Sequence, residues 1–175
     1  MSTIWFISDT HFGHENILKF KDSNGNMIRN FTNVFEMDET MINNWNSLVS
    51  KQDKIYHLGD VHFTDDKRAT EILQRLNGHK RLIIGNHDKL TRNSPLVRVF
   101  DKIMMWWPFE EFIFSHVPLR EDQMTMRTGN KFNVHGHIHQ NDSPTKNHIN
   151  VSVEKINFTP ISLEQLRENK KALVP

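Results

Sequence analysis

Five short apolar runs along the chain each lead into a polar residue that can bind a metal ion. The runs are Ile4–Ile7, Ile55–Leu58, Leu82–Ile84, Phe112–Phe114 and Phe132–Val134. Short apolar runs bounded by turn-forming residues are typical of buried strands. In open α/β sheets, ligands bind at the carboxyl ends of the strands. We therefore expect the polar residues that follow these runs to converge at one edge of one sheet.

Helical patterns separate the predicted strands. Apolar residues recur at helical spacing between Met37 and Val49, which predicts an amphipathic helix there. A second helix is expected over 66–76, with a stop at Asn77-Gly78. Ser162, with Gln165 three positions later, is a capping-box signature for a last helix. Minor elements are expected as follows: a short helix at 15–20, strands at 103–107 and 149–153, and loops at 21–33, 92–95, 117–131 and 141–147. Strands alternating with helices predict a layered α/β domain.

Composition narrows the class of protein. A length of 175 residues predicts one domain, and we expect a single domain over 1–175 without a cap domain. Cysteine is absent, which excludes disulfides and thiolate metal ligands. No apolar stretch is long enough to cross a membrane and no signal peptide is evident, so we expect a cytoplasmic protein. The net charge of +1 gives no basis for broad nucleic-acid binding.

Histidine is abundant, with eleven in the chain, and five of them follow the predicted strands. Neutral imidazole is the commonest metal ligand in proteins. The candidate ligands are Asp9, His11, Asp60, Asn86, His116, His137 and His139. Seven nitrogen and oxygen donors exceed the four that a tetrahedral ion needs, and they suit two ions about 3.5–4 Å apart that share a carboxylate. Asp60 is the natural bridge because it is central in the order.

The spacing of these residues has a mechanical meaning. Residues two apart on an extended segment point the same way, so Asp9/His11 and His137/His139 would each face the site if the chain stays strand-like. Gly59, Gly85 and Gly136 allow tight turns beside the metals.

His87 follows the ligand Asn86 but is not needed to complete either set of ligands. It is therefore free for proton transfer or for stabilising charge on a phosphate oxygen. Asp88 can hydrogen-bond its imidazole and hold the ring in position. We take His87 and Asp88 as the catalytic candidates.

In chain order, the segments Asp-x-His, Gly-Asp, Gly-Asn-His-Asp, a lone His and Gly-His-x-His resemble the calcineurin-like metallophosphoesterase superfamily. The match runs from residue 9 to residue 139. The resemblance implies an α/β fold, a layered sandwich of two mixed β-sheets flanked by α-helices. It also implies that Asp9, His11, Asp60 and His139 bind one metal, and that Asp60, Asn86, His116 and His137 bind the other. A metal-bridging hydroxide would attack phosphorus while His87 stabilises the transition state or protonates the leaving group.

Other polar residues have competing interpretations. His14 and His62 are candidate substrate-binding residues, although a plain helix-terminal histidine is an equal alternative for His14, and a non-catalytic role is favoured for His62. We expect structural roles for the remaining histidines, His57, His79, His135 and His148. Loop cations that can bind phosphate, but for which we favour solvated surface charge, are Arg29, Arg92, Arg120, Arg127 and Lys131.

The sequence therefore predicts a di-metal phosphoester hydrolase, with a phosphodiesterase favoured, because a domain without a cap leaves its centre in an open groove. Its substrate would be a small or nucleotide phosphodiester. Mn²⁺ is the expected metal, with Fe, Zn²⁺ or Ni²⁺ as alternatives, because mixed His, Asp and Asn ligands discriminate weakly. The alternative functions are a phosphomonoesterase or nucleotide phosphatase, a nuclease, and a catalytically silent binding scaffold. Nothing in the sequence sets the oligomeric state.

Overall fold

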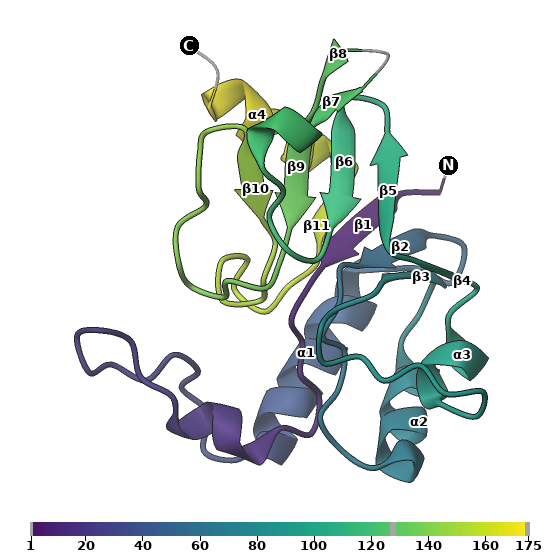
Figure 1. Ribbon diagram of the computed structural model, residues 1–175. Helices are drawn as coiled ribbons and strands as arrows, with labels where there is room; N and C mark the ends of the chain where they lie inside the picture. Colours follow the sequence, from purple (N-terminus) through teal and green to yellow (C-terminus); the bar gives the residue numbers. More distant parts are fainter. Residues whose placement is uncertain (1, 127–128, 174–175) are drawn as a thin grey trace.

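The computed structural model describes residues 2–126 and 129–173. Its larger sheet has five strands in the order β11-β1-β2-β3-β4 (Figure 1). The strands are β1 Ile4–Ile7, β2 Lys54–His57, β3 His79–Ile83, β4 Lys102–Met104 and β11 Ile161–Ser162. The first four run parallel, and β11 pairs antiparallel with β1. Three of the five predicted strands, those that begin at residues 4, 55 and 82, lie side by side in this sheet as β1, β2 and β3.

The other two predicted strands belong to a second sheet, in the order β10-β9-β6-β5. Its strands are β5 Trp106–Phe109, β6 Phe112–Ser115, β9 Phe132–His135 and β10 His148–Asn150. The strand predicted over 103–107 is instead two strands, because the chain leaves the first sheet after Met104 and enters the second at Trp106. A small hairpin, β7 Thr125–Met126 and β8 Gly129–Asn130, lies in the predicted loop 117–131.

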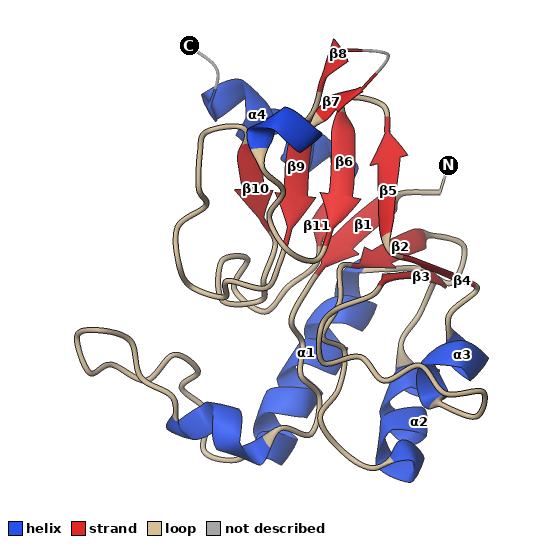
Figure 2. Cartoon of the chain, viewed as in Figure 1, coloured by secondary structure: helices blue, strands red, loops and turns tan. Residues whose placement is uncertain are grey.

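Helices flank the two sheets (Figure 2). Their bounds are η1 Glu15–Lys19, α1 Val34–Leu48, α2 Asp66–Arg75, α3 Pro95–Val99, η2 Glu121–Gln123 and α4 Leu163–Leu173. The capping box is confirmed, since the Ser162 amide donates to Gln165 Oε1 at 2.7 Å and the Gln165 amide to Ser162 Oγ at 3.2 Å. The helix α3 was not predicted, although Ser94 caps it and Pro95 occupies its first turn, the usual arrangement at a helix start.

Alternation along the central strands divides the core in two. Ile7, Ile55 and Leu82 pack with α1 and α2 on the outer face of the five-stranded sheet. Their neighbours Phe6, Tyr56 and Ile83 belong to a second cluster, which the four-stranded sheet completes. Successive side chains on a strand point to opposite faces, so each strand contributes to both clusters. Among the helices that the structure describes, none has the length and hydropathy needed to cross a bilayer.

Backbone hydrogen bonds join the two sheets just beyond the ends of β1 and β10. The Ser8 amide donates to Val151 O at 3.0 Å, and the Val153 amide donates to Ser8 O at 3.1 Å. The candidate ligands therefore converge from the carboxyl ends of strands in both sheets. The expectation that one sheet alone supplies them was wrong, because short apolar runs do not reveal which sheet a strand joins.

Candidate metal centre

The loops that carry the candidate ligands are sharply turned. Positive φ angles occur at five of the seven candidates: Asp9 58°, His11 46°, Asp60 57°, His137 72° and His139 51°. Non-glycine residues rarely adopt this left-handed region, and they do so mostly where surrounding contacts hold them in place. The condition that these segments stay strand-like is therefore not met. The left-handed turns, and not strand alternation, direct these side chains to a common point.

Two glycines lie directly against the carboxylates. A Cβ added at Gly85 would come within 2.2 Å of Asp60 Oδ1, and one added at Gly136 within 2.3 Å of Asp9 Oδ2. These separations are far below van der Waals contact, so only glycine lets the two loops approach the carboxylates. The prediction of close approach at these positions is confirmed.

The first group of donors is enclosed and is here called the inner cluster: Asp9, His11 and His139. One donor atom from each lies within 4.8 Å of the others. Asp9 and His11 are 0% and 3% exposed. Neither ring nitrogen of His11 has a hydrogen-bond partner among the described residues. A buried imidazole without partners is costly, and a bound cation would satisfy it.

The second group is more open and is here called the outer cluster: Asn86, His116 and His137. Asn86 Oδ1 lies 2.9 Å from both His116 Nε2 and His137 Nδ1, and those two nitrogens are 3.3 Å apart. Donors bound to one ion at about 2.1 Å are expected roughly 3.0–3.4 Å from each other. The His116 Nδ1–H donates to Leu58 O at 2.7 Å, which directs its Nε2 into the cluster.

Asp60 lies between the two clusters. Its Oδ2 is 3.6 Å from His11 Nε2 in the inner cluster and 3.4 Å from His116 Nε2 in the outer cluster. Asp9 also reaches both sides, since its carboxylate groups with Asp60 and His116 as well as with His11 and His139. Two buried carboxylates therefore lie between two sets of nitrogen donors.

The electrostatics of the site favour bound positive charge. Burial raises the pKa of Asp9, and burial lowers the pKa of His11 to about 2 with a further contribution from the charge of Arg29. At Asp60, burial by itself raises the pKa, but the hydrogen bond and charge of His116 hold it below its usual value. The lowered pKa values of Asp60 and His11 favour ionised carboxylate and neutral imidazole, the forms that bind metals, whereas the pKa values of Asp9, His116 and His139 are raised.

A buried ion pair supports the inner cluster, and the sequence did not predict it. The side chains of Arg29 and Glu154 are 0% and 3% exposed and lie 2.7 Å apart. Glu154 Oε1 accepts from His139 Nδ1 at 2.9 Å, and Arg29 donates to Asp9 O at 2.5 Å and to Thr10 O at 2.9 Å. Carboxylates behind ligating histidines fix the orientation of the ring. The pKa of Glu154 is about 2, because the hydrogen bond of His139 and the charge of Arg29 outweigh burial.

One of these two residues had a signal in the sequence. Glu154 directly follows the alternating apolar residues Ile149, Val151 and Val153, so the strand-end pattern used elsewhere also applies to it. Arg29 had none, because it lies in a polar loop, and the expectation of surface charge there was wrong. Lys131 is also buried, at 8% exposed, and donates to Glu110 O. Arg127 lies outside the described residues.

The two catalytic candidates differ in their surroundings. The His87 ring is exposed, with its centroid 5.7 Å from that of His11, and its backbone amide donates to Asp60 Oδ1 at 2.9 Å. Among the described residues, no hydrogen bond joins the Asp88 carboxylate to the His87 ring. Its carboxylate instead accepts from the amides of Asp60, Val61 and Gly85 at 3.0, 2.9 and 2.8 Å. The prediction of an Asp88–His87 hydrogen bond was therefore wrong, because three backbone amides donate to the two oxygens of the Asp88 carboxylate instead.

His14 and His62 both lie near the site. The His14 ring is 5.7 Å from His11 and stacks on Phe63 at 4.3 Å. His62 lines an open pocket of about 420 Å³ together with His87. The Nδ1 atoms of both are buried without a partner among the described residues. His57, His135 and His148 have the structural roles expected of them, since each is buried and hydrogen-bonded to its own part of the frame.

Comparison with known proteins agrees with this geometry. The sequence profile of the calcineurin-like phosphoesterase family matches residues 2–174. The chain belongs to the calcineurin-like phosphoesterase family. An uncharacterized protein of Methanocaldococcus jannaschii, MJ1445, is 36% identical over 94% of this chain and 89% of its own length. The gene 66 protein of Mycobacterium phage L5 is 30% identical over 79% of this chain and 78% of its own length.

A solved structure shares the fold. The crystal structure of AQ665 from Aquifex aeolicus, a protein of unknown function, superimposes with a TM-score of 0.75 at 27% identity, covering 96% of this chain and 99% of that one. Calcineurin-like phosphoesterases are metal-dependent phosphoester hydrolases, and the residues here fit such a role. The donor separations in the outer cluster match those around one ion. In the inner cluster, the buried His11 nitrogens have no hydrogen-bond partner among the described residues and could bind a second ion.

Proposed function

We propose that this calcineurin-like phosphoesterase is a phosphodiesterase that uses two divalent cations, with Mn²⁺ as the working metal. The observation that carries the proposal is the position of Asp60 Oδ2 within 3.6 Å of a nitrogen from each cluster. Asp9, His11, Asp60 and His139 would hold one cation, and Asp60, Asn86, His116 and His137 the other. When bound, the cations polarise the phosphoryl group and lower the pKa of water.

The protein's own groups prepare the remaining steps. The backbone bond from His87 to Asp60 fixes the start of the His87 side chain beside the bridging carboxylate. From there the exposed ring can donate a proton from a ring nitrogen to the oxygen of the departing alcohol. Asp88 keeps the loops of Asp60 and Gly85 in register through its three amide contacts, so it acts on position and not on the proton.

The preference for a diester rests on two hollows that flank the centre. One, of about 420 Å³, is lined in part by His87, and the other, of about 220 Å³, is lined in part by His137 and His139. A diester has a substituent on each side of the reacting phosphate, and the two hollows supply room for both. A monoester would leave one of them without an occupant.

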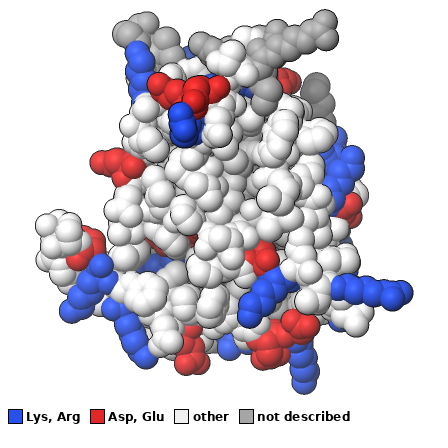
Figure 3. Space-filling model, in the orientation of Figure 1, with Lys and Arg blue, Asp and Glu red and all other residues white. Residues whose placement is uncertain are grey.

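A small substrate is favoured over a long nucleic acid. The net charge is only +1, and on the face in Figure 3 positive and negative side chains are interspersed without a continuous basic area. Binding to a nucleic-acid backbone usually depends on several clustered cations.

The test compares bis(p-nitrophenyl) phosphate with p-nitrophenyl phosphate after loading the metal-free protein with Mn²⁺. We expect the diester to have the higher kcat/KM, and we expect Fe²⁺, Zn²⁺ and Ni²⁺ to support lower rates. A higher kcat/KM for the monoester would show a phosphomonoesterase. Hydrolysis of neither ester above background would show a binding scaffold.

A further inference from the structure

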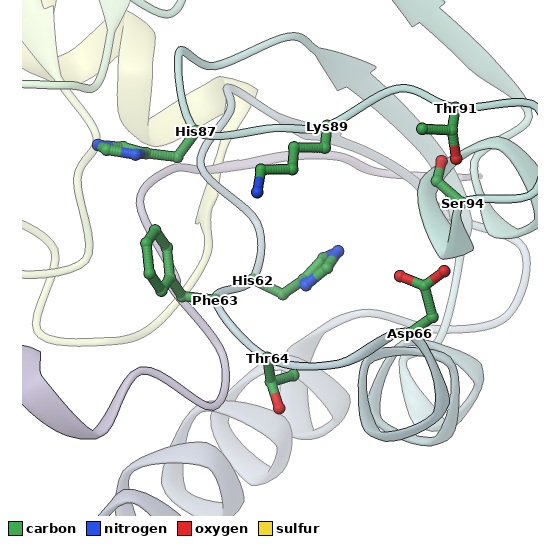
Figure 4. A pocket seen from close by; sticks show the side chains of 8 residues that line it. All are labelled: His62, Phe63, Thr64, Asp66, His87, Lys89, Thr91 and Ser94. Carbon is green, nitrogen blue, oxygen red and sulfur yellow. The ribbon is translucent and has the colours of Figure 1, made fainter.

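We propose that the pocket beside His87 binds the nucleoside part of a small nucleotide phosphodiester, with Phe63 as the platform for the base. This inference rests on the proposed function, since it names the group that leaves from the same site. The pocket is lined by residues of two loops, one between β2 and α2 and the other between β3 and α3, and by the first turn of α2 (Figure 4). No residue of either metal cluster lines it, so it is a site for the substrate's organic part.

Phe63 is set up as a stacking surface. Its side chain is 50% exposed although it lies at the edge of a buried centre. One face is supported by the His14 ring at 4.3 Å and 26°, which fixes the orientation of the phenyl ring. The rings of Phe63 and His87 are 5.7 Å apart at 70°, so the platform begins where the proposed proton donor stands. Exposed aromatic rings held in this way are typical stacking platforms for nucleobases.

The polar groups of the pocket match a nucleotide from end to end. Lys89 projects into the space between His87 and His62, near the phosphate side, whereas the Asp66 carboxylate stands at the opposite wall beside Thr91 and Ser94 (Figure 4). A nucleotide has an anionic phosphate at one end and hydroxyl or amine donors at the other. The cation and the carboxylate therefore lie at the ends where this ligand needs them.

The position of His87 determines which part of the diester the pocket holds. Water adds to phosphorus, the bond from phosphorus to the departing oxygen breaks, and that oxygen takes up a proton. Because His87 lines this pocket and its ring centroid lies 5.7 Å from that of His11, the alcohol that receives the proton is the one inside the pocket. The leaving group is therefore the nucleoside, and the second hollow receives the substituent that stays on phosphate.

The test measures binding by calorimetry to the Mn²⁺-loaded protein, with adenosine 5′-monophosphate, ribose 5-phosphate and inorganic phosphate as probes. Phosphate release is assayed afterwards to confirm that the nucleotide stayed intact. We expect the mononucleotide to bind roughly 5- to 150-fold more tightly than ribose 5-phosphate, the range that stacking of one base gives. Phe63→Ala and Phe63→Leu should abolish this ratio, and Phe63→Tyr should keep it.

Phe20 provides a matched control. It is also 50% exposed and also touches the His14 ring, but it lines the second hollow. Phe20→Ala should leave the ratio unchanged. Lys89→Gln should weaken the mononucleotide and ribose 5-phosphate equally, again without changing their ratio.

Three results would overturn the inference while leaving the proposed function intact. The first is diester hydrolysis with no difference in affinity between the mononucleotide and ribose 5-phosphate. The second is loss of the ratio in Phe20→Ala instead of Phe63→Ala. The third is an adenylate hexamer that binds more than about tenfold tighter than the mononucleotide with a steep salt dependence, which would show a strand of nucleic acid as the ligand. Absence of any Mn²⁺-dependent diester hydrolysis would instead contradict the proposed function.

Discussion

The inner and outer clusters use the same kinds of donor in different surroundings. In the inner cluster, Asp9 and His11 are almost fully buried, and the ion pair of Arg29 and Glu154 supports the backbone and the His139 ring from behind. In the outer cluster, Asn86 is exposed, and His116 is oriented by a single carbonyl. From this difference in burial and support, we expect the inner position to bind its metal more tightly than the outer position.

The largest change should come from removing what the clusters share. Asp60→Asn replaces the carboxylate whose Oδ2 lies between His11 and His116. Loss of the bridging charge should lower metal content at both positions and reduce turnover to the level of metal-free protein. Metal analysis by mass spectrometry and the diester assay measure the two effects. Asp22→Asn, in an exposed loop, is the control. Two bound metals in Asp60→Asn would contradict a shared carboxylate.

The next largest effect should separate catalysis from metal binding. His87 belongs to neither cluster, so His87→Ala should leave metal content near normal. Loss of a general acid typically reduces kcat by roughly 10²–10⁴-fold, and we expect a loss in this range. His79→Ala, whose ring is exposed and pairs with Asp101 at 3.5 Å, serves as the control. Full activity in His87→Ala would show that another group delivers the proton.

A smaller change should act on the inner cluster alone. Glu154→Gln removes the negative charge behind His139 while keeping the size of the side chain. Changes at such supporting positions typically weaken metal binding by about 10–100-fold, and we expect this loss for one of the two ions only. Titration of the metal-free protein with Mn²⁺ would resolve the two affinities.

Glu121→Gln is the matched control, because Glu121 accepts hydrogen bonds from Thr145 and Asn147 in an exposed loop. Equal weakening of both ions in Glu154→Gln would mean that the two clusters share their support. Retention of both affinities would mean that the ion pair with Arg29 serves stability alone.

The features of the site that the sequence predicts are those that depend on local segments of the chain. The candidate ligands were predictable because each follows an apolar strand, and strand ends are where α/β folds place ligands. The close approach of Gly85 and Gly136 to the carboxylates was also predictable, because a glycine beside a ligand residue lets the backbone come close where a Cβ would clash. These features are local, so a single segment is enough to read each of them.

What the sequence missed depends on long-range contacts. Arg29 lies in a polar loop, and only the fold brings it to Glu154, 125 residues away. The left-handed turns at Asp9 and His137 likewise depend on tertiary contacts, because the His137 amide donates to Asp9 across 128 residues. The pairing of Asp88 was wrongly predicted from adjacency to His87, whereas its amide donors come from the neighbouring loop as well as its own.

The smallest predicted effect concerns the frame beneath both clusters. His57 accepts from the Gly59 amide at 3.2 Å, next to Asp60, and its Nε2 lies 2.9 Å from Thr10 Oγ1, between Asp9 and His11. Burial lowers its pKa to about 3, from an ordinary value of 6.5. As pH falls below 6.5, the unfolded chain binds a proton that the folded protein does not, so stability decreases until the pH approaches 3. From this group alone, the free energy of unfolding should fall by about 2 kcal/mol between pH 7.5 and 5.

Urea unfolding of metal-free wild-type protein and of His57→Gln at pH 7.5, 6 and 5 would isolate this contribution. The variant should be less stable at pH 7.5, because it loses the hydrogen bonds of the His57 ring to Gly59 and Thr10. Its stability should nevertheless fall less steeply towards pH 5. The remaining histidines titrate in both proteins, so they cancel in the difference. Parallel pH profiles for the two proteins would mean that the pKa of His57 is the same in the folded and unfolded states, which would contradict a pKa lowered by burial.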